Sequence, residues 1–552
     1  MAPHTGKQSL QERPNAEEKE SLLPTKRAPN PSCPQYRSVI VSVCSFILVT
    51  EFCERLAYYG LSGSLPIFFH RNLGLSTVLA TELNSTFTSL SYLTPLLGAS
   101  VRRRHPRATS GKDSFFNWFY WAINVGATFS YGVLTNLAVN GLPPYISADF
   151  GFFASFAIPS AAFVLAALVF YAGKGRYRRV PPKGGALSKF FSVLIQAGSR
   201  SRRGKLVLSG GLAFAPGIVL TTVSYFIQDD FTHMAVALVG AGAVAYGTFV
   251  LIFSGAATDW LRLATRTNGG SFSFQDVAQV VRLAPYLGII IIFWAVYGQM
   301  NSNFVVQGCQ MDLRVQGSEG ASGKPVLLSS AMLNVVDSGV ILIFIPVFDR
   351  LLYPLSTKMG IYPTLLRKIG AGLVFALLSM LAAGWVEQIR KSSSMIEGIS
   401  SNCSAAGESL PMSSISVWWQ TPQYVLVGVA EILTSISAYD LFYSEVPESM
   451  RSVCQALNLL TTTLGFIVAG AINSIFSFWV TSDLNDGHLE YIYFLMAFLV
   501  LVLLVAFIFV SQSFEYHVPP PGVDSVSGFS PALSRAAREL RKKLQFQRNG
   551  SK

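Results

Sequence analysis

The decapeptide Glu51-Phe52-Cys53-Glu54-Arg55-Leu56-Ala57-Tyr58-Tyr59-Gly60 lies inside the first long apolar run of the chain, residues 38–69. A transmembrane helix needs about 20 mainly apolar residues, so this run is long enough to cross a bilayer. Ionisable side chains inside a span cost about 2.5–3.5 kcal/mol each on insertion scales, and they persist where they face each other or a wet cavity. Helical spacing puts Glu51, Glu54 and Arg55 on one face. This trio is therefore a candidate proton or substrate relay; a structural ion pair that locks two helices is the alternative.

The composition is that of a polytopic membrane protein. Of 552 residues, 51% are hydrophobic and 13% are charged, whereas soluble domains carry about 25% charged residues. The net charge of +12 comes from basic residues clustered in connecting segments, as the positive-inside rule expects, and does not indicate nucleic acid. The six cysteines have no metal-ligand spacing, so we predict neither a metal site nor a disulfide framework. Residues 1–36 have no apolar signal-peptide core, so the first span must serve as the targeting signal.

Several stretches resemble the proton-coupled oligopeptide transporter family, a branch of the major facilitator superfamily. The pattern Glu-x-x-Glu-Arg-x-x-Tyr-Tyr-Gly at 51–60 is similar to the first-helix signature of that family, and residues 91–99 are similar to its second helix. Residues 119–126, Phe-Tyr-Trp-Ala-Ile-Asn-Val-Gly, resemble its fifth helix. The run at 293–300 resembles its seventh helix, most closely in the peptide/histidine transporter branch, and 419–431 resembles its tenth.

The third and fourth helices of the family have no counterpart in this chain. After the second-helix motif the sequence continues with the basic stretch 101–107 and goes straight to the fifth-helix motif. Losing two helices keeps both flanking ends on the cytoplasmic side. Two Gly/Ala-rich apolar runs, 206–227 and 233–257, resemble the extra helix pair that some family members carry between their bundles. The alternative is that they fill the space of the missing pair; in either case we expect no chemistry in residues 204–257.

We therefore predict an all-α polytopic membrane protein with the two-bundle major-facilitator fold. It has about twelve spans, ten family helices plus the inserted hairpin, and both termini are cytoplasmic. The predicted parts are a disordered cytoplasmic tail (1–37), a truncated N-terminal bundle (38–172), a cytoplasmic linker that contains the hairpin (173–282), a C-terminal six-helix bundle (283–512) and a basic cytoplasmic tail (513–552).

A carrier of zwitterionic peptides needs a cation for the carboxylate, an anion for the ammonium and a group that takes up a proton. Arg55 can supply the cation, and Glu431, about ten residues into its span, can supply the anion; a Glu capped by a neighbouring helix is the alternative. The resemblance implies that Glu431 holds the peptide amino group and that Arg55 shares the carboxylate with a fourth-span Lys, which this chain lacks. Proton coupling is assigned to Glu51, Glu54 and Arg55, with Glu431 as a further group that could take up the proton. Further substrate hydrogen bonds, with helix packing as the alternative role, are assigned to Tyr58, Tyr59, Tyr297, Gln299 and Asn334.

Two short motifs bear on targeting and modification. Glu18, Leu22 and Leu23 resemble an acidic dileucine signal that binds sorting adaptors; an accidental Leu pair in a polar tail is the alternative. Asn402 begins an N-glycosylation sequon in a predicted lumenal loop. Asn84 also fits the sequon but lies at membrane depth and should stay unmodified. We expect a multi-pass protein of the endosomal, lysosomal or vacuolar membrane, or of the plasma membrane.

The resemblance implies a proton-coupled symporter of di- and tripeptides, with histidine as a further candidate, that works by alternating access of two bundles. Its partners would be a small peptide, protons and the lipid bilayer, with no cofactor. A transport-deficient truncated family member with a structural or regulatory role is the alternative. An enzyme would need a His/Asp/Ser or metal constellation at one depth, and none is visible. Family members with near-identical motifs carry peptides, nitrate or other solutes, so the motifs do not fix the substrate.

Overall fold

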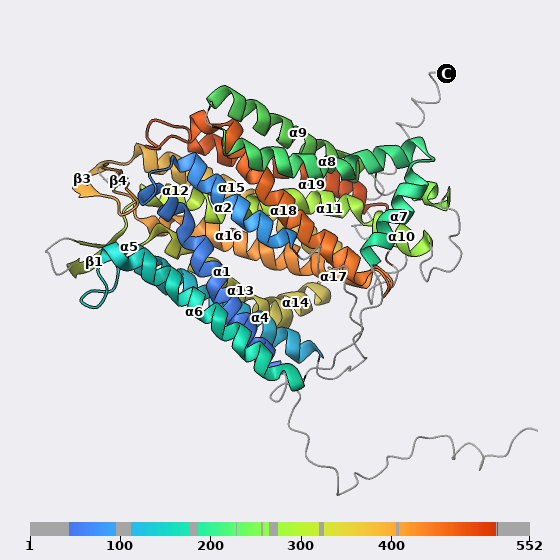
Figure 1. Cartoon of the computed structure of the whole chain (residues 1–552), viewed down its shortest axis with the longest axis horizontal. Coiled ribbons are helices and arrows are strands. Elements are labelled where there is room, and N and C mark those ends of the chain that lie inside the picture. The colour runs from blue at the N-terminus through green and yellow to red at the C-terminus, as the bar shows by residue number, and fades with distance from the viewer. Residues whose placement is uncertain are drawn as a thin grey trace, which may run out of the picture.

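The computed structural model describes residues 44–94, 112–176, 186–227, 229–254, 258–263, 274–319, 325–404, 408–514 and 516. Long helices run side by side through the molecule, with two short β-hairpins at one end (Figure 1). The dileucine candidate (Glu18, Leu22 and Leu23), the basic stretch 101–107 and most of the basic C-terminal tail lie outside the described residues.

The first half of the molecule consists of the helices that precede residue 176. They are α1 (Ser45–Arg71), α2 (Thr77–Leu93), α4 (Lys112–Phe129) continued by η3 (Ser130–Leu134) and α5 (Thr135–Asn140), and α6 (Gly151–Ala172). The central helix is α1, which packs against α2, α4 and α6. Two further spans would need about 40 residues, so residues 94–111, between α2 and α4, are too few to hold the two missing family helices.

A hairpin of two apolar helices follows the amphipathic helix α7 (Ala186–Gly198). Its helices, α8 (Arg202–Ser224) and α9 (Asp230–Ser254), approach closely because glycines face the partner helix: a Cβ at Gly240 would clash with the Thr221 hydroxyl. Helix α9 packs against α11 and α18, and outward-facing residues such as Leu212 and Phe253 are exposed. The hairpin therefore lies on the outside of the second half, at the upper edge of Figure 1.

The second half contains six spans and most of the buried core. They are α11 (Ala284–Tyr297) with η7 (Gly298–Asn301) and α12 (Asn303–Cys309); α13 (Asn334–Val347) with η9 (Phe348–Leu352) and α14 (Tyr353–Lys358); α15 (Leu365–Ser392); α16 (Thr421–Glu431) with η11 (Ile432–Ile436) and α17 (Ser437–Ser444); α18 (Arg451–Ile475); and α19 (Leu489–Ser511). The short helix α10 (Phe274–Arg282) leads into α11. The division of the chain into bundles, linker and tails remains a prediction.

The described residues include ten helices that are long and apolar enough to cross a membrane. Helices α1 and α2 are not among them. Three charged residues interrupt the apolar character of α1, and α2 is described for only 17 residues. Both lie in the bundle beside the other spans. Helices α1 and α2 and the ten candidate spans together make up the twelve spans that the sequence predicts.

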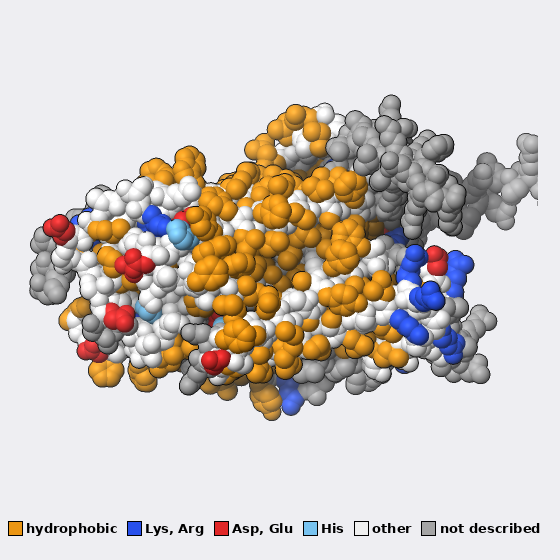
Figure 2. Space-filling model, turned by 90° about the horizontal axis from the view of Figure 1, so that it is seen from above, with side chains coloured by type: hydrophobic (Ala, Val, Ile, Leu, Met, Phe, Trp, Pro, Cys, Tyr) orange, Lys and Arg blue, Asp and Glu red, His pale blue; other side chains and the backbone are white. Residues whose placement is uncertain are grey.

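Charge is distributed unevenly along the bundle. Lys and Arg gather at the end that carries α7 and α10, acidic side chains gather at the end that carries the β-hairpins, and an apolar band lies between them (Figure 2). The basic end includes exposed Arg202, Arg203 and Lys205 at the start of α8. By the positive-inside rule this is the cytoplasmic end, and the opposite end is called lumenal below.

The lumenal end contains two antiparallel hairpins and a disulfide. Strand β1 (Arg314–Glu319) pairs with β2 (Pro325–Leu327), and β3 (Met395–Ser400) pairs with β4 (Pro411–Ser413). Cys309 and Cys403 form a disulfide, so our prediction of no disulfide was wrong. Cysteine spacing could not reveal the bond, because folding brings together residues that are 94 positions apart. A lumenal location is where such bonds persist.

Candidate functional site

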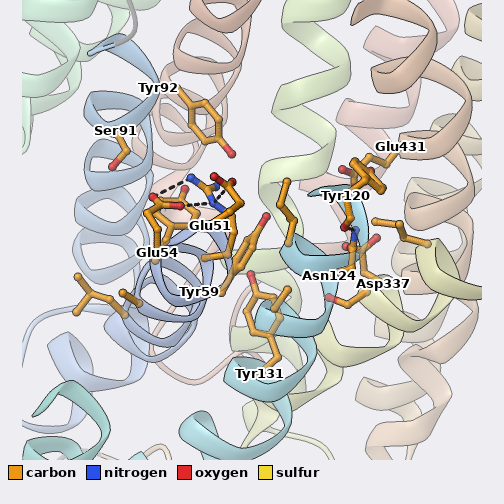
Figure 3. Close-up of a pocket in the computed structure, with 18 of the residues that line it drawn as sticks. Glu51, Glu54, Tyr59, Ser91, Tyr92, Tyr120, Asn124, Tyr131, Asp337 and Glu431 are labelled. Carbon is orange, nitrogen blue, oxygen red and sulfur yellow. Dashed lines mark hydrogen bonds and ion pairs between the residues drawn. The ribbon is translucent and has the colours of Figure 1, made fainter. Parts of the chain in front are cut away.

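A cavity of about 910 Å³ lies between the two halves. The first half supplies its walls from α1, α2, α4 and α6, and the second half supplies them from α11, α13, α16 and α17. Aromatic side chains line much of it, and ionisable side chains gather at two places on opposite walls (Figure 3). A concave site of this size and mixed polarity is typical of small-molecule binding, for which about 300–1,000 Å³ is usual.

The first ionisable group is the α1 trio. Arg55 donates to Glu54 through two bonds, Nη2 to Oε1 at 2.8 Å and Nε to Oε2. Its Nε also lies 3.4 Å from Oε1 of Glu51. The guanidinium stands 5.2 Å from the ring centre of Tyr58 and 5.9 Å from that of Tyr59. Because the Arg55 side chain is 22% exposed and lines the cavity, the trio faces the cavity and not the lipid.

The second group lies on the opposite wall. Glu431 ends α16, and the Tyr297 side chain hydrogen-bonds it. Asp337 of α13 lies against α16 one turn earlier, where a Cβ at Gly428 would be 2.9 Å from its Oδ1. Within the described part of the chain, Oε2 of Glu431 and Oδ1 of Asp337 are buried without a hydrogen-bond partner. Figure 3 shows both carboxyl groups across the cavity from Glu51 and Glu54.

The charge balance of the cavity is acidic. Its described lining contains four carboxyl groups, from Glu51, Glu54, Asp337 and Glu431, and only one strongly basic group, that of Arg55. Carboxylates held out of bulk water need a compensating positive charge. The arrangement therefore favours a species that brings positive charge into the cavity, such as a proton or an ammonium group.

The structure brings most of the predicted site residues together. Those that line the cavity are Glu51, Glu54, Arg55, Tyr58, Tyr59, Tyr297 and Glu431. Their roles in proton coupling and substrate binding remain predictions. Arg55 and Glu431 both line the same cavity between the halves.

Gln299 and Asn334 do not line the cavity, which corrects our prediction of their positions. Gln299 is fully buried inside the second half, donates to the Ala295 carbonyl and accepts from Asn303. It follows Tyr297 by two residues, which turns a helical side chain to the far side. Asn334 is buried one turn before Asp337 on α13 and donates to the Ala331 carbonyl. It therefore lies on the lumenal side of the cavity.

Sequence reasoning overlooked Asp337. It is a carboxylate inside a predicted span, and an ionisable residue at membrane depth is itself a signal of function. The same rule identifies Glu431. Further polar residues of the lining were also not predicted, among them Tyr92, Tyr120, Asn124 and Tyr131.

The cavity is closed toward the lumenal end by contacts between the halves. Asn84 of α2 donates to the Asn301 carbonyl at 2.9 Å, and the Tyr131 hydroxyl lies 3.2 Å from Oδ1 of Asn301. Asn140 donates to the Leu327 carbonyl at 2.7 Å. The lining extends the other way to Thr94, an exposed residue after the end of α2. The structure is therefore an inward-open arrangement, and Figure 1 shows α1, α4 and α6 diverging from α17 toward the cytoplasmic end.

The two sequon asparagines differ in position. Asn84 is 2% exposed within the lumenal contact. Asn402 lies at the lumenal end, next to the disulfide, and its Nδ2 donates to the Leu328 carbonyl at 3.0 Å. Glycosylation of Asn402 would leave one hydrogen on Nδ2, and it remains a prediction.

Two helical halves around a polar cavity that is open at one end are the arrangement expected of a membrane transporter. The family model described as "PTR2: POT family" matches residues 91–486. The chain therefore belongs to the POT family, whose members are membrane transporters and not enzymes.

Individual relatives agree with this assignment. Protein NRT1/PTR family 8.1 of Arabidopsis thaliana is 26% identical over 578 aligned residues, which cover 86% of this chain and 93% of that protein. This aligned length exceeds the 552 residues of the chain, so the alignment contains gaps. The crystal structure of the POT family transporter PepTSo is similar with a TM-score of 0.64 and 19% identity, over 85% of this chain and 97% of that one. A POT family transporter in complex with 5-aminolevulinic acid gives a TM-score of 0.54 at 17% identity, over 84% of this chain and 96% of that one.

Proposed function

We propose that the protein is a proton-coupled symporter of di- and tripeptides, with histidine as a further candidate substrate, and that it works by alternating access. The observation that carries this proposal is the placement of the Arg55 trio opposite Glu431 and Asp337 across one cavity. A zwitterion with charges at its two ends fits such a site, because each end meets the opposite charge.

The two walls would take different ends of the substrate. The ammonium group would bind Glu431, with Asp337 beside it, because these carboxyl groups have buried oxygens without partners in the described structure. The substrate carboxylate would bind Arg55, which is the only strongly basic residue of the described lining. Tyr58 and Tyr59, which flank the guanidinium, would then contact the peptide backbone.

Coupling would follow from competition for Arg55. In the structure its guanidinium is shared by Glu51 and Glu54. A substrate carboxylate that binds Arg55 must displace at least one of them. A carboxylate that loses its cationic partner takes up a proton more readily. Substrate binding and protonation would therefore favour each other, which is what symport requires.

The relatives support the class of solute but do not fix it. The similar structures include a named peptide transporter and one in complex with 5-aminolevulinic acid, a molecule with an amino and a carboxyl group. The names of the NRT1/PTR family relatives do not specify a peptide or an amino acid as substrate. The cavity therefore carries the argument for a zwitterion.

A transport-deficient family member is the second candidate. The stretch 94–111 is too short for the third and fourth family helices, so the first half has four spans within the described residues. The cationic partner that the family places on its fourth helix is therefore missing. In a truncated first half, Arg55 alone would bind the substrate carboxylate.

Uptake into proteoliposomes separates the two candidates. Purified protein is reconstituted, an inward proton gradient is imposed, and uptake of a radiolabelled dipeptide is measured with and without a protonophore. We expect accumulation that the protonophore abolishes and that Arg55→Ala reduces to the level of empty liposomes. The matched control is Glu490→Gln, which removes a lumenal carboxylate outside the cavity lining. No gradient-driven accumulation by folded wild-type protein would exclude the symporter and favour the second candidate.

A further inference from the structure

A second carboxyl group is buried away from the cavity. Glu82 lies on the lumenal half of α2 and is 1% exposed. Its Oε1 accepts a hydrogen bond from Ser474 of α18, which belongs to the second half. Its Oε2 has no partner within the described part of the chain. Glu82 does not line the cavity, and the proposed transport mechanism does not use it.

The inserted hairpin brings a histidine to this carboxyl group. Nε2 of His233, on the first turn of α9, lies 4.0 Å from Oε1 of Glu82. Its other ring nitrogen, Nδ1, lies 2.8 Å from the Ser224 carbonyl oxygen. A carbonyl oxygen only accepts, so this contact places a hydrogen on Nδ1. The tautomer is therefore set by the hairpin itself, and Nε2 is the nitrogen that faces Glu82.

The two groups are too far apart for a hydrogen bond but close enough for an ion pair. If Nε2 and Glu82 were both deprotonated, a lone pair would face a buried carboxylate, which is unfavourable. One proton on Nε2 makes the contact an attractive ion pair between an imidazolium and the Glu82 carboxylate. A second proton leaves an imidazolium beside a neutral acid and removes the ion pair.

Three other ionisable groups lie close to the pair. The Tyr225 hydroxyl, between α8 and α9, lies 2.5 Å from where a Cβ of Gly470 would be, and Ser85 lies 3.7 Å from the same point. Asp229 lies four residues before His233, and its carboxylate accepts from Thr232. His70, at the lumenal end of α1, lines a small pocket together with Thr81 of α2. The other described ionisable side chains of the packed elements are Cys53, Tyr58, Tyr59, Arg71 and the trio on α1, Tyr92 on α2, Arg202, Arg203 and Lys205 on α8, Tyr246 on α9, Tyr286 and Tyr297 on α11, and Arg451 and Cys454 on α18.

The pair spans the boundary between the halves. Glu82 belongs to α2 in the first half, whereas Ser474 is in α18 and His233 is on a hairpin that packs against α11 and α18. The lumenal contact of Asn84 with Asn301 lies half a turn farther along α2. Opening the lumenal side must separate α2 from α18, and therefore must also separate Glu82 from its partners.

We propose that Glu82 and His233 form a proton-binding site, distinct from the transport cavity, that holds the lumenal ends of the two halves together while it carries one proton. This inference rests on the proposed alternating access for its role in transport. It also assigns chemistry to residues 204–257, where the sequence alone indicated none. The α8–α9 hairpin then takes part in closing the lumenal side of the protein, because its His233 is the basic group of the pair.

Pulsed electron–electron double resonance, which measures distances between spin labels, tests the proposal without any substrate. Spin labels are placed at two exposed lumenal positions, Leu73 and Phe478, in full-length protein in nanodiscs. The cysteines outside the disulfide (33, 44, 53 and 454) are replaced by alanine or serine. Label-to-label distances are then measured from pH 5 to pH 8. The wild-type protein should show a population with a short lumenal distance that changes with pH.

Two variants and one control decide the outcome. Glu82→Gln and His233→Gln should each lose this pH response and shift the population toward longer distances. The control, Glu490→Gln, removes a Glu–His contact of 3.0 Å that lies entirely within the second half, and it should behave as wild type. A pH response that persists unchanged in either folded variant, or that is absent from wild type, would overturn the proposal. If the variants lose the response but dipeptide uptake is never seen, the proton site stands and the transport function falls.

Discussion

Replacing Glu431 with Gln tests the ammonium site with little change in shape. Gln has nearly the same volume but no charge, and the Oε2 that it replaces has no hydrogen-bond partner in the described structure. The variant should therefore fold as wild type. A hydrogen bond to a charged group contributes about 1.5–3 kcal/mol. Taking about 2 kcal/mol, the loss corresponds to a roughly 30-fold weaker affinity, since about 1.4 kcal/mol is tenfold.

The assay is a competition experiment with two ligands. Binding of a dipeptide and of its N-acetyl derivative is measured for wild type and variant, by thermal shift or by competition with labelled peptide. The acetylated ligand has no ammonium group, so Glu431→Gln should weaken dipeptide binding about 30-fold and should barely change binding of the acetylated ligand. Asp337→Asn is the matched variant on the neighbouring helix. Equal losses for both ligands would refute the ammonium assignment and indicate a structural role for Glu431.

Three other substitutions test separate parts of the account. Glu54→Gln should keep counterflow of peptide but lose accumulation driven by a pH gradient, because it removes a protonatable partner of Arg55; unchanged gradient-driven uptake would contradict the coupling scheme. Gly428→Ala places a Cβ 2.9 Å from Oδ1 of Asp337, so it should lower thermal stability by about 1–3 kcal/mol and reduce uptake; a variant with wild-type melting and uptake would show that the contact is not tight. At the lumenal surface, desolvation raises the pKa of Asp312, but the hydrogen bonds from Arg314 outweigh it and the net pKa is lowered. The Asp312–Arg314 pair therefore stabilises the fold above about pH 4 and loses that effect as the pH falls through the lowered pKa. Arg314→Ala should lower the free energy of unfolding by less than about 1 kcal/mol near pH 7 and should not change it in strong acid. Denaturation of wild type and variant at both pH values measures the difference.

The parts of the site that the sequence predicted are those that depend on a single helix. Glu51, Glu54 and Arg55 are close because of their spacing on α1, which helical geometry alone determines. Glu431 was identified because a carboxylate in the middle of a span is costly and usually marks a functional position. The number and placement of the spans followed from the length of the apolar runs and the charges between them, whereas the two-bundle fold followed from the family resemblance.

The parts that it missed depend on how different helices meet. Gln299 and Asn334 were assigned to the cavity from polarity, but their direction depends on helix phase and on where the halves close. The Cys309–Cys403 disulfide joins segments that no spacing rule connects. The contact of Glu82 with His233 arises only because the hairpin packs against α18 beside α2. Asp337 is different, since its position in a span was visible and was overlooked.

The central claim is that a substrate zwitterion lies across the cavity with its ends on opposite walls. Cryo-electron microscopy of the protein with a saturating dipeptide tests it most directly. The account predicts density in the cavity, with the amino nitrogen within hydrogen-bond distance of the Glu431 carboxylate and the carboxyl group at the Arg55 guanidinium. A cavity without density at saturation, or a peptide bound elsewhere, would contradict it.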